Sequence, residues 1–497
     1  MRTDLANSAA RSRTLTELLD EVAALRADVA AEALVWLAAH GVDRAEPRLA
    51  NLAHYMALRR RDLRPLQRRL MRFGLSSLGR LEGRVLPTLD AVMLALSALA
   101  GRPSSTAASQ DDDRAFFGGE VRLAEEADAL FGPGGKARRG RIMVTLPGSA
   151  ATDPGMILDL AKRGMDVARI NCAHDDAFAW RAITAHVRAA GERIGRPLTV
   201  LMDVAGPKIR IEAALPERKA KLVAGDAIRL IASGEPSATE ETPFCAAVSL
   251  PAIVERVRIG DRFRYDDGKM EGVVERTGPG EAVIRITRTK AGGAKLKPEK
   301  GINLPDTDLD LSPLTLKDEG DLATVVACAD MVGYSFVSRP EDIDLLEEAL
   351  ARQGEGTKRL GIVAKIEQPR AVSNLPDLIA RVLATSRPFG VMIARGDLAA
   401  EIGFERTAEM QEEILWICEA ASVPTIWATQ VLEDLVKDGL PSRGEMTDAA
   451  MAARAECVML NKGPHVAEAV TLLDGMLARM DEHMFKKTPT LRALKSW

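Results

Sequence analysis

The chain has 497 residues, of which 46% are hydrophobic and 28% charged, and its formal net charge at pH 7 is −4. This composition excludes collagen-like, disordered and disulfide-rich mini-protein classes and supports a globular protein of several domains. No stretch approaches 18 consecutive apolar residues, and the N-terminus lacks the apolar segment of a secretory signal, so we expect a cytoplasmic protein without a membrane partner.

The cysteine pattern agrees with that expectation. Five cysteines stand at positions 172, 245, 328, 418 and 457, and no two of them are spaced as CxxC. An odd number at such spacing predicts neither a disulfide framework nor a zinc site, and it is typical of a reducing compartment.

Residues 1–130 are predicted to form an N-terminal helical extension. The segment Thr14-Leu-Thr-Glu17 matches a capping box and predicts a helix start ahead of a Leu- and Ala-rich stretch. Residues 101–112 are rich in turn formers and acids, which predicts a linker. Seven arginines lie within residues 58–72 with few aromatic residues among them, so we interpret this run as a solvated helix face and expect no nucleic-acid partner.

From residue 141 onward, short β-rich apolar runs alternate with helical segments. The eight runs span 141–146, 166–171, 198–203, 330–335, 360–366, 389–394, 424–428 and 456–460. Eight such units predict an α/β fold built on a parallel (β/α)8 TIM barrel. We assign this catalytic domain to residues 138–210 and 312–482, followed by a tail over 483–497.

Residues 211–311 separate the third run from the fourth and have a different pattern. Apolar and polar residues alternate within 227–233, 261–267, 271–277 and 282–288, and Gly or Asp-Gly turns lie between these segments. The pattern predicts a separate small β domain inserted in a loop of the barrel.

Polar residues gather where the predicted barrel strands end, which is where barrel enzymes place their active sites. Two carboxylates, a lysine and an arginine would meet at this mouth. Mg²⁺ prefers one or two carboxylates together with phosphate and water, and Arg and Lys neutralise a transferring phosphoryl group. We therefore interpret the mouth as a phosphoryl-transfer site for a small anion, although enolase-type and aldolase-type barrels use similar groups. The strand-end residues are Thr145, Arg169, Asn171, Asp203, Ser335, Lys365, Glu367, Arg395, Asp397, Thr429, Gln430 and Asn461.

Between residue 141 and about residue 480 the sequence resembles the pyruvate kinase family. The matching motifs are VARINCAHD (167–175), DVAGPKIR (203–210), YDDG (265–268), KGINLP (300–305), AKIEQP (364–369), IARGDLAAEIG (393–403), IWATQVLEDL (426–435) and LPSRGEMTDAA (440–450). They occur in the family's order and spacing. The resemblance implies phosphoryl transfer from phosphoenolpyruvate to ADP, giving pyruvate and ATP, with Mg²⁺ or Mn²⁺ in a homo-oligomer, either a dimer or a tetramer.

The resemblance also implies roles for individual residues. Arg169 would hold the substrate phosphate, and Lys365 would stabilise the charge that passes between donor and acceptor. Thr429 would lie beside the enolate carbon. Glu367 and Asp397 would bind the metal. The backbone that would face the substrate carboxylate belongs to Ala394, Arg395 and Gly396.

The nucleotide and the inserted domain complete this picture. The implied nucleotide-binding residues are Asn171, His174 and Arg210. The inserted domain, a small β-barrel in the family, would close as a lid that excludes water from the reaction.

Two positions depart from the family at its K⁺ site. Asn171, Asp203 and Ser335 match that site, but Ala173 lacks the usual hydroxyl ligand. Lys208 stands where K⁺-dependent members have a glutamate. A lysine ammonium would supply the missing positive charge, so we predict activity that does not require K⁺.

The motif after the eighth strand departs more strongly. Asn461-Lys-Gly-Pro-His465 replaces the family's SGET, so the serine and glutamate that help to protonate the enolate are absent. Lys462, His465 or a water molecule would have to replace them. This departure leaves open an enzyme acting on another enolpyruvate or 2-keto acid, or a weakly active ligand-binding scaffold. Only 36 residues follow Asn461, so we expect no C-terminal regulatory domain.

Overall fold

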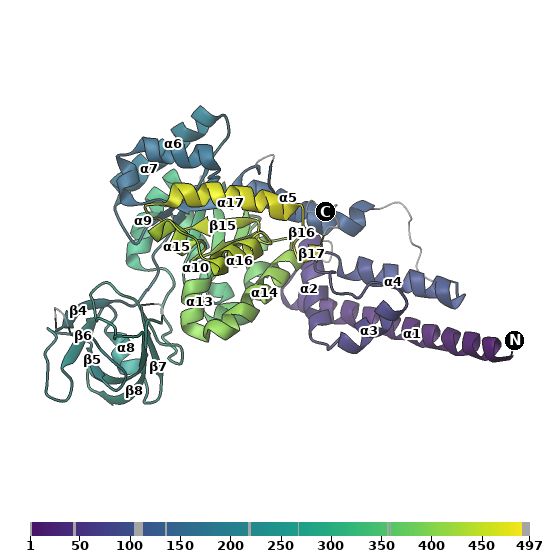
Figure 1. Cartoon of the computed structure of the whole chain (residues 1–497), viewed down its shortest axis with the longest axis horizontal. Helices are drawn as coiled ribbons and strands as arrows, with labels where there is room; N and C mark the ends of the chain where they lie inside the picture. The colour runs from purple at the N-terminus through teal and green to yellow at the C-terminus, as the bar shows by residue number, and fades with distance from the viewer. Residues whose placement is uncertain are drawn as a thin grey trace.

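The computed structural model describes residues 2–42, 46–103, 113–134, 137–216, 220–266, 268–354, 357 and 359–489 (Figure 1). It shows a closed eight-stranded barrel, a second sheet inserted in it, and helices that precede it. The predicted fold class is therefore confirmed. Residues 104–112 of the predicted linker, Asp267 and residues 490–497 of the predicted tail lie outside the described residues.

All eight predicted runs form strands of the barrel. The strands are β1 (Arg141–Thr145), β2 (Val167–Asn171), β3 (Thr199–Asp203), β11 (Met331–Tyr334), β12 (Gly361–Ile366), β13 (Phe389–Ala394), β14 (Thr425–Ala428) and β15 (Cys457–Leu460). They pair in parallel in the order β1-β15-β14-β13-β12-β11-β3-β2. Most of their side chains are buried, on both faces of the sheet, which explains why the runs are mainly apolar rather than alternating.

Helices between the strands cover the outside of the barrel. They are η1 (Gly148–Ala151), α6 (Pro154–Arg163), α7 (Ala177–Ile194), α9 (Leu316–Cys328), α10 (Pro340–Ala351), α11 (Pro369–Ser373), α12 (Leu375–Leu383), α13 (Arg395–Ile402), α14 (Phe404–Ala420), α15 (Glu433–Asp438), α16 (Arg443–Ala452) and α17 (Val466–Asp481). Capping side chains fix the start of some of these helices. At α6, the carboxylate of Asp153 accepts a hydrogen bond from the Met156 amide at 3.0 Å. After α17 the chain forms a short hairpin of β16 (Met484–Phe485) and β17 (Thr488–Pro489).

The inserted segment forms its own curled sheet with its own apolar core. Its elements are β4 (Ile211–Leu215), β5 (Ala227–Ile231), β6 (Phe244–Val248), α8 (Ala252–Arg256), β7 (Arg262–Tyr265), β8 (Met270–Gly278), β9 (Glu281–Thr289) and β10 (Ile302–Asn303). The strand order is β10-β7-β8-β9-β5-β6-β4. A bridge between Arg210 and Gly301 brings the two edges together. The inserted sheet lies to one side of the barrel and the N-terminal helices to another (Figure 1).

The N-terminal helices are α1 (Arg2–Ala39), α2 (Pro47–Arg59), α3 (Arg64–Arg72), α4 (Val85–Ala100) and α5 (Asp113–Phe131). Because α1 begins at Arg2, the predicted helix start at Thr14 is wrong. The preceding residues include Ala9, Ala10 and Arg11, which are strong helix formers and let the helix continue towards the N-terminus. Among the described residues, no helix has both the length and the hydropathy needed to cross a membrane.

The last turn of α5 closes the end of the barrel where the strands begin. Ala127, Leu130 and Phe131 belong to one apolar cluster with the inward-facing side chains of the strands. A Cβ atom on Gly361 or Gly390 would lie within 2.7 or 2.5 Å of Leu130, so these glycines make room for it. The barrel interior is therefore a packed core that α5 completes.

This packing predicts a large effect of shortening Leu130, whose exposed surface is 2%. The variant Leu130→Ala leaves a cavity at the barrel entrance and is expected to lower the free energy of unfolding by about 2–5 kcal/mol. Urea unfolding followed by fluorescence measures this change. Val121→Ala, on the same helix but with 52% of its surface exposed, is the matched control. If Leu130→Ala lowered the free energy of unfolding as little as Val121→Ala does, the conclusion that α5 closes the barrel would be wrong.

Candidate active site

The two-residue period of β-strands carries polar side chains to the inside of the barrel at its mouth. Val167 and Leu201 face the interior, and so do Val363 and Met331. Two positions further along each strand, the same face carries a polar or charged residue or a glycine. These residues are Arg169, Asp203, Lys365 and Gly333. The strand-end residues singled out from the sequence therefore converge for a geometric reason.

Arg169 and Asp203 form the first charge pair of the site. The Arg169 guanidinium donates through Nε to Asp203 Oδ2 at 2.9 Å and through Nη1 to Thr145 Oγ1 at 3.0 Å. Asp203 has 1% of its surface exposed. Its side chain extends over Gly333 on the neighbouring strand, where a Cβ atom would lie 2.9 Å from Asp203 Oδ1.

Lys365 is the centre of the cluster. Its ammonium Nζ donates to Ser335 Oγ at 2.7 Å and lies 2.8 Å from Glu367 Oε1 and 3.3 Å from Asp203 Oδ1. Glu367 also accepts a hydrogen bond from the Phe336 amide at 2.8 Å. The Lys365 ammonium thus contacts two buried carboxylates, and Asp203 has Arg169 as a second positive partner.

The charges in this cluster determine its protonation. Burial by itself would lower the pKa of Lys365, but Asp203 and Glu367 outweigh it and raise the pKa above its ordinary value. Burial would raise the pKa of Asp203, but Lys365 and Arg169 hold it below the ordinary value. Burial, followed by the nearby charge of Asp397, raises the pKa of Glu367. The cluster therefore holds a protonated lysine and an ionised Asp203 at neutral pH.

Glu367 and Asp397 form a carboxylate pair whose chemistry fits a divalent cation. Both supply hard oxygen ligands, which Mg²⁺ and Mn²⁺ prefer, and two carboxylates leave coordination positions for substrate and water. The raised pKa of Glu367 arises partly from Asp397, and a cation between the two would favour the ionised form of both. The described residues contain no group of three or more His, Cys, Asp or Glu side chains placed to hold a metal.

Lys208 lies on the segment that leads into the inserted domain. Its Nζ donates to Asp397 Oδ1 at 2.7 Å, and this positive charge outweighs burial and lowers the pKa of Asp397. The ammonium that contacts Ser335 and Asp203 is that of Lys365. Asn171 Oδ1 accepts a hydrogen bond from the Ala173 amide at 3.0 Å. Of the monovalent-site positions named from the sequence, Asp203 and Ser335 therefore contact the Lys365 ammonium, whereas Lys208 pairs with Asp397.

A second set of strand-end residues is held by Arg395. Its guanidinium binds the Asp448 carboxylate through both Nη atoms, donates to the Thr429 carbonyl at 2.7 Å and lies over the Trp427 ring at 4.7 Å. The Gly396 amide donates to Thr429 Oγ1 at 2.8 Å. Thr429 adopts a φ of +65°, which β-branched residues rarely take, so its hydroxyl is fixed by a strained backbone.

Two cations and a histidine from distant segments lie close enough to interact electrostatically. Burial, then the charges of Lys462 and Arg210, lower the pKa of His174 below its ordinary value. Arg210 is fixed by a hydrogen bond from Nη1 to the Glu299 carbonyl at 2.9 Å. His465 lies elsewhere, against Gly439, where its ring carbon is 3.1 Å from the position of a Cβ atom. Of the two candidates in the altered motif after β15, Lys462 is therefore the one near His174.

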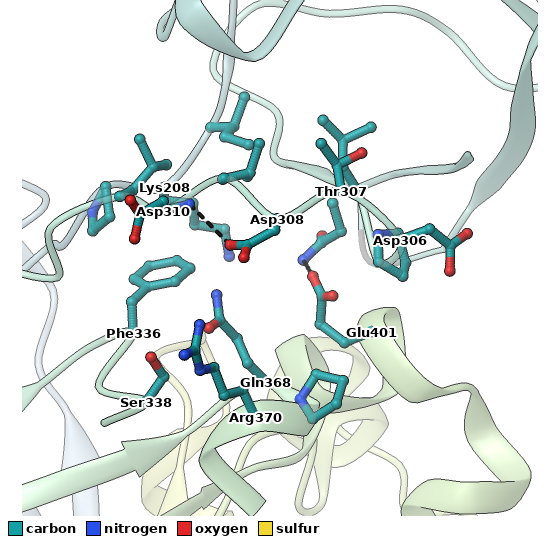
Figure 2. Close-up of a pocket in the computed structure, with 18 of the residues that line it drawn as sticks. Lys208, Asp306, Thr307, Asp308, Asp310, Phe336, Ser338, Gln368, Arg370 and Glu401 are labelled. Carbon is teal, nitrogen blue, oxygen red and sulfur yellow. Dashed lines mark hydrogen bonds between the residues drawn. The ribbon is translucent and has the colours of Figure 1, made fainter. Parts of the chain in front are cut away.

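The inserted domain contacts the barrel through α13. Arg264 Nη1 donates to the carbonyls of Ala399 and Ala400 at 2.8 Å each, at the helix end where a cation is favoured. Asn303 Nδ2 donates to Glu401 Oε1 at 2.7 Å. A cavity of about 330 Å³ lies between the two parts. Figure 2 shows Lys208, Gln368 and Arg370 pointing into this cavity, with Glu401 on its barrel side.

Sequence reasoning did not single out Arg264, Glu401 or Asp448. Glu401 and Asp448 both lie within motifs that were matched, but no spacing rule pairs Asp448 with Arg395 or Glu401 with Asn303. Arg264 lies on β7 of the inserted domain. It was not considered because only the residues at the ends of the predicted barrel strands were taken as candidates.

The comparisons with known proteins agree with this geometry. The family model described as "Pyruvate kinase, barrel domain" matches residues 137–468. A protein named pyruvate kinase from Mycobacterium intracellulare is 31% identical over 362 residues, covering 71% of this chain and 72% of the relative. Another of the same name from Agrobacterium vitis is 32% identical over 365 residues, covering 72% of each chain.

The contact between Glu401 and the inserted domain predicts a pH dependence of stability. Burial raises the pKa of Glu401 from 4.5 to about 7. Between these values the folded state keeps a proton that the unfolded state releases, so stability falls as pH rises through this window. Glu401→Gln keeps a hydrogen-bond acceptor for Asn303. The variant is expected to lose less stability than wild type as the pH rises through this window.

Thermal unfolding at a series of pH values, with a chelator present, measures the slope. The exposed Glu409→Gln is the control and should retain the wild-type slope. Equal slopes in Glu401→Gln and wild type would refute this origin of the pH dependence.

Proposed function

This chain belongs to the pyruvate kinase family, and we propose that it transfers the phosphoryl group of phosphoenolpyruvate to ADP, giving pyruvate and ATP. The observation that carries the proposal is the Lys365 ammonium, held between Asp203 and Glu367 at the barrel mouth. A fixed positive charge with little exposure to water is what a transferring phosphoryl group requires.

In this proposal Arg169 binds the phosphate of phosphoenolpyruvate, and Lys365 stabilises the charge during transfer. Glu367 and Asp397 would hold the divalent cation, Mg²⁺ or Mn²⁺, which supplies charge neutralisation at the transferred group. The backbone from Ala394 to Gly396 would face the substrate carboxylate at the start of α13. A helix start favours an anion because its amide groups point outward.

The nucleotide would bind on the side of the mouth that holds Asn171, His174 and Arg210. Because its pKa is lowered, His174 is neutral at pH 7 and contributes hydrogen bonds rather than charge. Arg210 lies at the edge of the inserted domain, so closure of that domain as a lid would bring it onto the nucleotide.

Protonation of the enolate is the step for which this chain departs from its family. In this proposal Thr429, whose hydroxyl accepts a hydrogen bond from the Gly396 amide, would lie beside the enolate carbon. Lys462 is the candidate donor from the motif after β15, since its charge acts on His174, whereas His465 lies against Gly439. The same departure favours, as a second candidate function, action on another enolpyruvate or 2-keto acid. A non-catalytic scaffold is disfavoured because Lys365, Glu367, Asp397 and Thr429 are all present.

We also propose that the enzyme works without K⁺, in the cytoplasm, as a dimer or tetramer. The Lys208 ammonium beside Asp397 supports independence from K⁺, because it supplies a fixed positive charge at the edge of the site. The five cysteines are free and buried, which fits a reducing compartment.

Replacing Lys365 tests the catalytic proposal. Lys365→Met removes the central charge and is expected to lower kcat for pyruvate formation by about 10³-fold. A coupled assay of pyruvate from phosphoenolpyruvate and ADP measures it. Because the change leaves Glu367 without its lysine partner and Asp203 with Arg169 alone, Lys365→Arg and a melting curve serve as controls for folding. A folded Lys365→Met protein with turnover near that of wild type would contradict the assigned role.

The monovalent-cation proposal has its own test. Wild-type turnover is expected to be equal in matched Na⁺ and K⁺ buffers. Lys208→Gln removes the fixed charge beside Asp397 and is expected to lower turnover about tenfold, with partial recovery in K⁺ but not in Na⁺. Wild-type turnover that appears only in K⁺ would refute the role of Lys208 and leave the phosphotransfer proposal intact.

A further inference from the structure

The cavity between the inserted domain and the barrel carries charges that the proposed phosphoryl transfer does not use. We call it the interdomain cavity. Its volume is about 330 Å³, at the small end of the range of ligand pockets. The described side chains that line it do not include the charged cluster at the mouth, which consists of Arg169, Asp203, Lys365, Glu367 and Asp397. The interdomain cavity is therefore a separate space that adjoins the mouth.

Contacts between the two parts border the interdomain cavity on two sides. Arg339, which precedes α10, donates through Nη2 to Asp310 Oδ1 at 2.6 Å. Asn303 Nδ2 donates to Glu401 Oε1 at 2.7 Å. Figure 2 shows Asp310 and Glu401 at opposite sides of the cavity. The inserted domain is thus joined to the barrel on both sides, and the space between these contacts belongs to the junction itself.

Most charged side chains that line the interdomain cavity have a partner. In chain order, the pairs are Lys208 with Asp397 at 2.7 Å, Asp306 with Arg262 at 2.6 Å, Asp310 with Arg339 at 2.6 Å, and Glu401 with Asn303 at 2.7 Å. Asp308 and Arg370 are the remaining charged residues of the lining among those described. Within the described part of the chain, neither of these two side chains forms an ion pair.

Asp308 and Arg370 lie on opposite walls of the interdomain cavity (Figure 2). Asp308 belongs to the connection after β10, where its carboxylate accepts a hydrogen bond from the Asp310 amide at 3.2 Å. Arg370 lies on α11 of the barrel, and the side chain of Gln368 points into the cavity beside it. One wall therefore offers a carboxylate, and the other offers a guanidinium and an amide.

An apolar surface completes the interdomain cavity. Phe336 lines it together with Leu309 and Leu311. Gly206 has a φ of +66°, and a Cβ atom at this position would lie 2.6 Å from Phe336 Cδ2. The glycine thus makes room for the ring. A ligand in this cavity meets an aromatic ring as well as two opposite charges.

Two residues of the interdomain cavity also contact the carboxylate pair at the mouth. Lys208 Nζ donates to Asp397 Oδ1 at 2.7 Å. The Phe336 amide donates to Glu367 Oε2 at 2.8 Å. A ligand that lies against Lys208 and Phe336 is therefore one contact away from both carboxylates.

We propose that the interdomain cavity binds a free α-amino acid with an apolar side chain. Its carboxylate binds the Arg370 guanidinium, whose planar fork matches a carboxylate, and its ammonium group binds Asp308. Its side chain packs against Phe336. A ligand with only a carboxylate is repelled by Asp308, and one with only an ammonium group is repelled by Arg370. The inference does not depend on the proposed function, because binding requires no turnover.

Calorimetric titration of the full chain with L-leucine, in the presence of a chelator, tests the proposal. The chelator prevents the ligand carboxylate from binding through a metal ion at the mouth. Two analogues of L-leucine each lack one charge: 4-methylpentanoate has no ammonium group, and 3-methylbutylamine has no carboxylate. Wild type is expected to bind one L-leucine, and to bind each analogue about tenfold more weakly.

Single variants test the place of each charge. Arg370→Gln is expected to weaken binding of L-leucine and 4-methylpentanoate about tenfold, without weakening binding of 3-methylbutylamine. Asp308→Asn is expected to weaken binding of L-leucine and 3-methylbutylamine, without weakening binding of 4-methylpentanoate. The double variant Arg406→Gln/Asp438→Asn removes two exposed charges elsewhere on the barrel and is the matched control. It should bind L-leucine as wild type does.

Three results would overturn the proposal. The first is that wild type binds none of L-leucine, L-valine and L-phenylalanine. The second is an affinity for L-leucine that is the same in Arg370→Gln and Asp308→Asn as in wild type, which would place the ligand elsewhere. The third is 4-methylpentanoate binding as tight as that of L-leucine, which would identify a site for simple anions.

Discussion

The ammonium group of Lys365 is the charge on which the mouth of this barrel depends. Asp203 and Glu367 have almost no exposed surface, and buried carboxylates without partners are strongly destabilising. Apolar side chains fill the barrel beneath them and Leu130 seals its far end, so the charges at the mouth must balance one another. Lys365 reaches both carboxylates, and Arg169 adds a second positive charge at Asp203. The result is a preorganised cationic centre between fixed carboxylates.

The same need for balance links the inserted domain to the carboxylates at the mouth. Lys208, on the segment that enters the inserted domain, pairs with Asp397 at the start of α13. Arg264 and Asn303, from strands of that domain, bind the other end of the same helix. A movement of the inserted domain therefore changes the charge next to Asp397 and the contacts of α13 together. Under the proposed function, this link would connect closure of the inserted domain to the site of phosphoryl transfer.

The two ends of the chain are joined to the barrel by similar contacts. Asn51 on α2 donates to the Ala420 carbonyl at the end of α14 at 2.7 Å. In the C-terminal hairpin, Lys486 pairs with Glu456 before β15, and Lys487 pairs with Glu82 and lies over the Trp416 ring at 4.6 Å. One hairpin thus contacts both the barrel and the N-terminal helices. Removal of either end would leave charged groups of the other without partners.

The sequence by itself determined the barrel, because strands buried on both faces must be continuously apolar and eight such runs alternate with helices. It also determined which polar strand-end residues converge, since the period of two carries Arg169, Asp203 and Lys365 to the inside of the mouth. Local patterns were less reliable: a capping box at Thr14 did not start a helix, because helix formers precede it. The partner of each charge was decided only by the tertiary structure. Lys208, whose positive charge was expected to replace that of K⁺, binds Asp397, 189 residues away in the chain. No local pattern encodes such a distance, because the position of a long side chain at a domain junction depends on how the two parts pack.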